Sequence, residues 1–176
     1  MDWISPSGRK IVLHDGDITR VPVDAMANAA NAALAGGGGV DGAIHRAGGP
    51  TLMQELRAYH GCPTGSAVPT GAGKLPAKYV FHAVGPIYRD GLHGEAELLA
   101  GCYRKCLALA DERGVRSLSF PAISTGVYGY PQHEAAAIAI REVREHLERA
   151  DTSLREVVFV LYGKAAYDIY GALLAL

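Results

Sequence analysis

The apolar and polar positions divide the chain into short β-like runs that alternate with longer helical segments. Several β-like runs are apolar on both faces, which is typical of strands buried between two layers of helices. The helical segments repeat apolar residues at intervals of three and four. We expect strands over residues 10–18, 25–30, 66–72, 79–85, 117–123 and 156–163, and helices over 40–47, 50–59, 95–113, 133–150 and 164–176.

This alternation predicts an α/β fold with helices on both faces of a mixed, mostly parallel sheet. No linker, repeat or low-complexity tract interrupts the pattern, and 176 residues are too few for two ordinary domains. We therefore expect one domain over residues 1–176. In such folds ligands bind at the carboxyl ends of the strands, so the loops that follow strands are the first places to search for function.

Composition narrows the class of protein. A hydrophobic content of 49% with 20% charged residues is typical of a soluble globular domain, and no run of about 18 apolar residues predicts a membrane span. The first residues lack the apolar core of a secretory signal, which favours the cytoplasm. A net charge of −1 without a Lys/Arg run argues against general nucleic-acid binding. We expect the three cysteines to be reduced and structural, because they do not form a zinc motif.

Four consecutive glycines, Gly36 to Gly39, lie between the β-like run 25–30 and the helix predicted from Val40. Backbone amides without side chains can approach a phosphate closely, and the helix N-terminus adds unpaired N–H donors. The alternative is a flexible surface turn, but ordering four glycines costs much entropy. The sequence therefore favours an anion-binding loop.

Three better-known phosphate and hydrolase motifs do not explain this loop. A G-x-G-x-x-G pattern is present as Gly37, Gly39 and Gly42, but it lacks the acidic residue that ends the second strand of a dinucleotide fold. The segment "GAGKLP" has neither the spacing of a P-loop nor its Ser/Thr after Lys74. No G-x-S-x-G elbow indicates a serine nucleophile.

A second glycine-bearing loop, "STGVYGYP", runs from Ser124 to Pro131 between a predicted strand and a helix. Two such loops can hold a pyrophosphate from opposite sides, with the ring of Tyr128 against a sugar. Ser124 and Thr125 are equally suited to bonding the backbone of their own turn. His14 and His82 lie in predicted strands, and we assign them no chemistry.

Several motifs in register resemble the macrodomain family, of the MacroD type: "GDI", "NAAN", "GGGGVDGAIHRAGGP", "CPTGSA", "HAVGP" and "PAISTGVYGYP". The resemblance covers nearly the whole chain. It implies a three-layer α/β/α sandwich around a mixed sheet and a cleft for ADP-ribose. It also implies hydrolysis of mono-ADP-ribose from acidic side chains of proteins and deacetylation of O-acetyl-ADP-ribose, with no metal and no cofactor.

The resemblance implies a role for each matched position. Asp17, beside the Ile18 backbone, would accept a hydrogen bond from the adenine amine. An aromatic residue of the final segment would stack on the adenine, with Tyr167 as the first choice and another aromatic as the alternative. Asn28, Asn31 and Asp41 would contact the distal ribose. The positions matched to the two diphosphate loops are Gly38, Gly39, Val40, Ser124, Thr125, Gly126, Val127 and Tyr128.

The three residues expected to carry the chemistry are Asn31, Asp41 and His45. Asp41 stands in a helix first turn, where a carboxylate is poorly basic but can orient water or ribose hydroxyls. Asn31 offers amide donors and an acceptor to a ribose, or caps its own loop. His45 follows Asp41 by four residues on the same helix face, and we expect it to orient the aspartate rather than transfer protons.

Two other functions use the same cleft: a non-catalytic reader of ADP-ribose, and a phosphatase acting on ADP-ribose 1″-phosphate. Intact Asn31 and Asp41 favour the hydrolase. The expected partners are ADP-ribose, its derivatives and mono-ADP-ribosylated proteins, with no membrane partner. We expect the chain to be a monomer.

Overall fold

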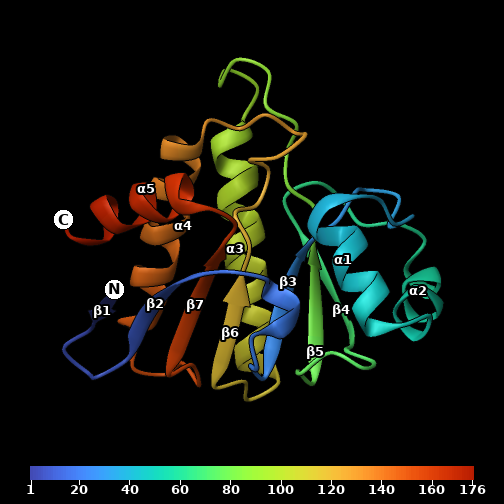
Figure 1. Cartoon of the computed structure of the whole chain (residues 1–176), viewed down its shortest axis with the longest axis horizontal. Coiled ribbons are helices and arrows are strands. Elements are labelled where there is room, and N and C mark those ends of the chain that lie inside the picture. The colour runs from blue at the N-terminus through green and yellow to red at the C-terminus, as the bar shows by residue number, and fades with distance from the viewer.

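The computed structural model describes all residues from 1 to 176 and contains a central sheet flanked by helices (Figure 1). Its strands are β1 (Asp2–Ile4), β2 (Lys10–Asp15), β3 (Ala25–Ala29), β4 (Ala67–Gly71), β5 (Tyr79–Ala83), β6 (Ser117–Phe120) and β7 (Glu156–Leu161). Its α-helices are α1 (Gly39–Gly48), α2 (Thr51–Leu56), α3 (Glu95–Glu112), α4 (Gln132–Leu147) and α5 (Lys164–Leu174). Two short 3-10 helices are η1 (Ile18–Arg20) and η2 (Arg57–Tyr59). None of these helices is long and apolar enough to cross a membrane.

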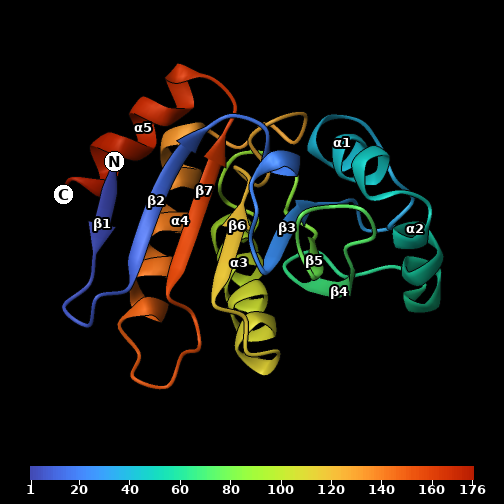
Figure 2. The ribbon, with the colours of Figure 1, turned by 60° about the horizontal axis from the view of Figure 1, so that its bottom comes forward.

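The seven strands form one sheet in the order β1-β2-β7-β6-β3-β5-β4, which Figure 2 displays from left to right. Strands β2, β7, β6, β3 and β5 are parallel, and only the edge strands β1 and β4 run antiparallel to their neighbours. The predicted mixed, mostly parallel sheet is therefore confirmed.

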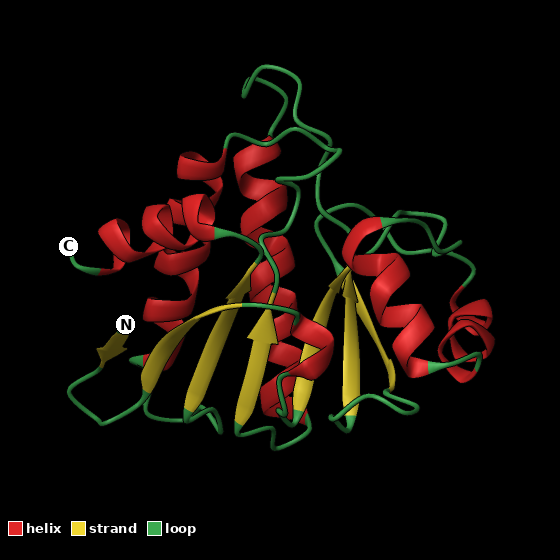
Figure 3. Ribbon diagram, viewed as in Figure 1, coloured by secondary structure: helices red, strands yellow, loops and turns green.

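Helices cover both faces of the sheet (Figure 3). The larger core lies between one face and helices α3, α4 and α5, where Phe120 and Phe159 stack with ring centroids 5.9 Å apart. The smaller core lies on the opposite face, where Met26 and Val80 of the sheet pack with Ile44 of α1 and Leu52 of α2. These two cores make the molecule the three-layer α/β/α sandwich that the sequence predicted.

Some boundaries differ from the sequence prediction. The strand β1 was missed, because three residues at an exposed sheet edge leave no readable alternation. Ile18 was expected in a strand but begins η1, because the Asp17 carboxylate caps that turn by accepting from the Thr19 amide. The strand β6 ends at Phe120, where Pro121 has no N–H to extend the ladder.

The five parallel strands all end at the same edge of the sheet, and the loops that follow them gather there, at the top of Figure 1. This edge receives the glycine loop after β3 and the loop 121–131 after β6. The fold therefore brings the two predicted anion-binding loops to one place.

Candidate active site

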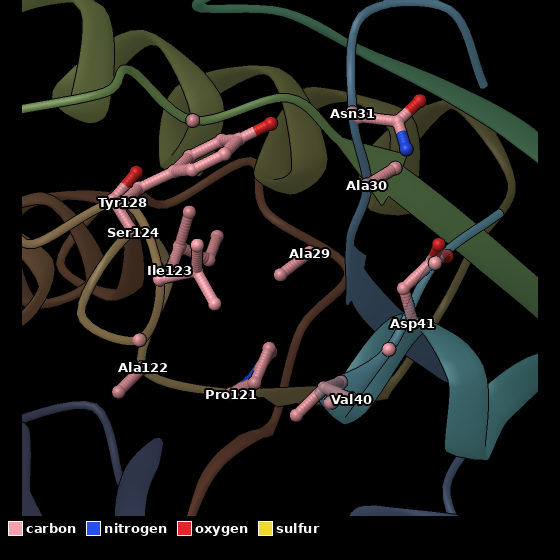
Figure 4. A pocket seen from close by; sticks show the side chains of 16 residues that line it. Ala29, Ala30, Asn31, Val40, Asp41, Pro121, Ala122, Ile123, Ser124 and Tyr128 are labelled. Carbon is pink, nitrogen blue, oxygen red and sulfur yellow. The ribbon is translucent and has the colours of Figure 1, made fainter. Parts of the chain in front are cut away.

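Two adjoining hollows open at the carboxyl edge of the sheet. The first, here called the central hollow, has a volume of about 350 Å³ and lies between the β3–α1 loop and the β6–α4 loop (Figure 4). The second, the side hollow, measures about 370 Å³ and is lined by residues from η1, α1 and the end of β7. Both are lined by Gly39, Val40 and Pro121, so they form one continuous trough.

The glycine loop forms one wall of the central hollow. Helix α1 begins at Gly39, and no side chain caps its first turn. The N–H groups of its first turn therefore remain available to an anion. A Cβ on Gly38 would meet no atom within 4 Å, which leaves the space in front of this backbone open.

The loop 121–131 forms the facing wall. Ser124 has a φ of 67°, which is rare for a residue with a side chain, and its Oγ is buried without a hydrogen-bond partner. Gly85 must lack a side chain here, because a Cβ would lie 2.1 Å from that oxygen. Thr125 does not line the hollow; its hydroxyl donates to the Ala122 carbonyl at 2.8 Å. Gly126, Val127 and Tyr128 do line it.

Asn31 and Asp41 lie together on the side of the hollow opposite Ser124 and Tyr128 (Figure 4). A Cβ on Gly37 would be 3.5 Å from Asp41 Oδ2 and 3.9 Å from Asn31 Nδ2, so the bare backbone of Gly37 leaves a gap between the two side chains. The Asn31 amide also bonds its own loop, donating to the Gly36 carbonyl at 2.8 Å. Asn31 therefore shapes the loop while its side chain borders the hollow.

A buried hydrogen-bond chain supports Asp41 from behind. Asn28 Nδ2 donates to Asp41 Oδ1 at 2.7 Å and lies 3.1 Å from His82 Nδ1, while His82 Nε2 lies 2.9 Å from Thr70 Oγ1. Asn28 and His82 have no solvent exposure, and Asp41 is only 6% exposed. Burial, with a smaller effect of nearby His45, lowers the pKa of His82 to about 3.

This pKa fixes the direction of the hydrogen bonds at neutral pH. A neutral imidazole has one donor and one acceptor nitrogen, and the amide of Asn28 can only donate to His82 Nδ1. His82 Nε2 then donates to Thr70, whose hydroxyl donates to the Gly71 carbonyl at 2.8 Å. These hydrogen bonds hold the Asn28 amide as a donor to Asp41 Oδ1, and they leave Asp41 Oδ2 without a hydrogen bond inside the protein.

His45 stands beside this chain, as its spacing on α1 predicted. Its Nε2 lies 3.3 Å from Asp41 Oδ1, but the contact lacks hydrogen-bond geometry and the nitrogen is buried without a partner. His45 does not line the central hollow. The structure therefore places it against the aspartate and outside both hollows.

The side hollow carries Asp17 and Ile18. The Asp17 carboxylate accepts from the Thr19 hydroxyl at 2.7 Å and from the Thr19 amide at 2.9 Å, and these bonds, side-chain bond first, lower the pKa of Asp17. The aromatic residue of this hollow is Tyr162, which follows β7 and is 92% exposed. Tyr167 lines neither hollow: it packs against the larger core, with its hydroxyl 3.2 Å from the N-terminal amine.

Comparison with known proteins shows the family of the chain. The Macro domain family model matches residues 27–139, which include the glycine loop and the loop 121–131. The chain belongs to the Macro domain family. A Macro domain-containing protein of Caldanaerobacter subterraneus is 54% identical over 92% of this chain and 93% of its own length. A Salmonella newport protein named O-acetyl-ADP-ribose deacetylase is 55% identical over 90% of both chains.

Solved macrodomain structures share the fold closely. The Oceanobacillus iheyensis macrodomain with ADP superposes with a TM-score of 0.92 at 42% identity, covering 99% of this chain and 94% of that one. The Trypanosoma brucei macrodomain in complex with ADP-ribose gives a TM-score of 0.86 at 43% identity, over 92% of this chain and 68% of that one. These likenesses extend beyond the sequence motifs to the arrangement of the whole sandwich.

Within this Macro domain, the residues expected from the sequence separate into two groups. Most of them line the trough, but Asn28, His45, Thr125 and Tyr167 do not. Asn28 lies in β3 with its side chain on the face of the sheet that α1 covers, because alternate residues of a strand face opposite sides. There it contacts Asp41 of α1 and His82 of the neighbouring strand β5. Sequence reasoning missed Tyr162, which its own emphasis on loops after strands could have found, and it missed the role of His82, for which no local signal exists.

Proposed function

We propose that this protein binds ADP-ribose along the trough and hydrolyses esters at its distal ribose. The substrates would be proteins that carry mono-ADP-ribose on an acidic side chain, and O-acetyl-ADP-ribose. The observation that carries the proposal is the gap at Gly37, which Asp41 Oδ2 and Asn31 Nδ2 border beside the glycine loop. The relative named O-acetyl-ADP-ribose deacetylase and the neighbours solved with ADP or ADP-ribose support it.

The geometry suggests how the ligand lies. Adenine in the side hollow would offer its amine to Asp17 and a face to the exposed ring of Tyr162. The diphosphate would accept from the α1 N-terminus and from the backbone of the loop 121–131. The distal ribose would then reach Asn31 and Asp41. We expect micromolar or tighter binding, about −8 kcal/mol, without a metal ion.

Hydrolysis adds water across the ester bond and yields a free carboxylic acid and ADP-ribose. Asp41 would orient the attacking water or a ribose hydroxyl through Oδ2, since its Oδ1 is already held by Asn28. Asn31 would hold the ribose, and a substrate phosphate would take part in proton transfer. His45 would keep the aspartate in position.

The deciding experiment incubates the protein, in chelator, with a glutamate-linked mono-ADP-ribosyl peptide and separately with O-acetyl-ADP-ribose, and identifies the products by mass spectrometry. Free ADP-ribose with the unmodified acid supports the hydrolase. Calorimetry with ADP-ribose provides the second arm. Tight binding without turnover of either substrate would identify a reader instead, and absence of binding would refute the trough assignment.

A further inference from the structure

A third hollow adjoins the trough at the end farthest from Asp17. It has a volume of about 420 Å³, and Gly85 and Tyr128 line both it and the central hollow. Ala32, the residue after Asn31, also lines it. We call this hollow the outer groove; its remaining wall comes from Thr64, from the segment between β5 and α3, and from the start of α3.

The shared residues set the order of the hollows. The side hollow meets the central hollow at Gly39, Val40 and Pro121, and the central hollow meets the outer groove at Gly85 and Tyr128. A ligand with its adenine at Asp17 and its distal ribose at Asn31 therefore directs any group attached to that ribose toward the outer groove. An acetyl group fills about 60 Å³, roughly the share of two water molecules, so the groove is much larger than an acetyl group requires.

The walls of the outer groove combine apolar surface with one free cation. Ile87 is 62% exposed, and Leu98 of α3 also lines the groove. Arg89 is exposed, and its guanidinium makes no ion pair or hydrogen bond within the protein. The other cationic candidate, His93, is already held by Asp90 at 2.8 Å.

Glu95 fixes the backbone that carries Arg89. Its side chain, in a residue only 2% exposed, accepts hydrogen bonds from the amides of Arg89, Asp90 and Gly91 through Oε2, and from that of His93 through Oε1. These backbone bonds, that of Arg89 first, lower the pKa of Glu95 to about 2. They also occupy the oxygens with which Glu95 could join Asp90 and His93 in a metal site. Hydrogen bonds therefore hold this segment as a fixed wall of the groove, and we assign no metal to it.

We propose that the outer groove binds the polypeptide segment around the modified acidic residue, with Arg89 pairing to a neighbouring carboxylate of that segment. This inference rests on the proposed protein hydrolysis and adds a preference to it: targets with further acidic residues beside the modified one. Ile87 and Leu98 would pack on the aliphatic parts of the same segment. O-acetyl-ADP-ribose, which carries no polypeptide, would not use the groove.

The test compares Arg89→Ala with wild type on three substrates: a mono-ADP-ribosyl peptide with acidic flanking residues, the same peptide with neutral flanks, and O-acetyl-ADP-ribose. We expect kcat/KM to fall about fivefold on the acid-flanked peptide, as for loss of one partly exposed ion pair. It should change less than twofold on the other two. Arg116→Ala is the matched control, because Arg116 is also exposed and unpaired but precedes β6 at the opposite edge of the sheet.

The apolar part of the groove has its own variant, Ile87→Asp, which should slow both peptides and spare O-acetyl-ADP-ribose. Equal losses on all three substrates, or no loss on the acid-flanked peptide, would overturn the groove assignment while leaving the hydrolase intact. If wild type releases no ADP-ribose from either peptide but deacetylates O-acetyl-ADP-ribose, the protein-hydrolase proposal itself fails, and the groove loses its occupant.

Discussion

The two aspartates at the ends of the trough are held in opposite ways. Asp41 is 6% exposed, and its hydrogen-bond donor Asn28 comes from the sheet, backed by His82 and Thr70 of two further strands. The side chain of Asp17 is 47% exposed, and its partners, Thr19 and Arg20, follow it within three residues.

The difference between Asp17 and Asp41 fits two separate tasks, recognition of the ligand at one end of the trough and hydrolysis at the other. An exposed carboxylate with local bonds can adjust to a base, and it tolerates small errors in position. A group that orients a reacting water must hold its geometry closely, because small displacements are costly in rate. The adenine end is therefore expected to govern affinity alone, and the Asp41 end to govern turnover.

The largest effect is expected for Asp41→Ala. Removing the positioned carboxylate should lower kcat at least about 100-fold, as for loss of a catalytic group. The affinity for ADP-ribose should change only a few-fold, because the diphosphate loops remain. Turnover of O-acetyl-ADP-ribose and calorimetry measure the two quantities, with the melting temperature as a check on folding. Normal hydrolysis by this variant would mean that Asp41 only stabilises the first turn of α1 and takes no part in catalysis.

Gly38→Glu should act on affinity and turnover together. The φ of Gly38 is −95° and a Cβ there meets open space, so the variant should fold, with its charge directed into the hollow. Like charges a few ångströms apart at intermediate dielectric repel by several kcal/mol before screening, enough for about a 100-fold loss of ADP-ribose affinity. Gly38→Ala is the neutral control and should lose much less. Unchanged binding by Gly38→Glu would mean that the diphosphate lies elsewhere.

His82→Leu tests the buried chain behind Asp41. Leucine has no acceptor for the Asn28 amide, so Asn28 is free to turn away from Asp41, and we expect kcat to fall about tenfold, equivalent to roughly 1.4 kcal/mol. KM should stay within twofold. His82→Gln can accept from Asn28 and should recover most of the rate. A loss of stability with kcat unchanged in the folded fraction would show that His82 serves the fold only.

The sequence was sufficient wherever the signal is local. The glycine run needs no partner from elsewhere to be recognised, because four bare residues before a helix already imply a backbone-lined surface. The spacing of Asp41 and His45 on one helix face likewise predicted their proximity, which the structure gives as 3.3 Å. The alternation of strands and helices predicted the sandwich for the same reason.

The sequence was insufficient where a role depends on which strands become neighbours. The resemblance to the family made Asn28 a ribose ligand, yet the pairing of β3 with β5 places it against His82. The resemblance also placed an aromatic residue of the last segment on the adenine, and Tyr167 was chosen for it, but Tyr167 lies on α5 and packs against the larger core. Only the end of β7 beside η1 and α1 brings Tyr162 into the side hollow.

The smallest expected effect is on ADP-ribose affinity at the side hollow, in Tyr162→Ala. Tyr167→Ala is its matched control. Stacking of a base on an aromatic ring contributes about 1–3 kcal/mol, and because Tyr162 is 92% exposed we expect the lower limit, about a fivefold weaker ADP-ribose affinity. Ribose 5-phosphate has no base, so its affinity should not change, and kcat at saturating substrate should stay within twofold. Tyr167→Ala should leave affinity unchanged, because Tyr167 lines neither hollow. Calorimetry with both ligands on both variants decides between the two tyrosines, and an affinity loss in Tyr167→Ala alone would restore the residue that the sequence first favoured.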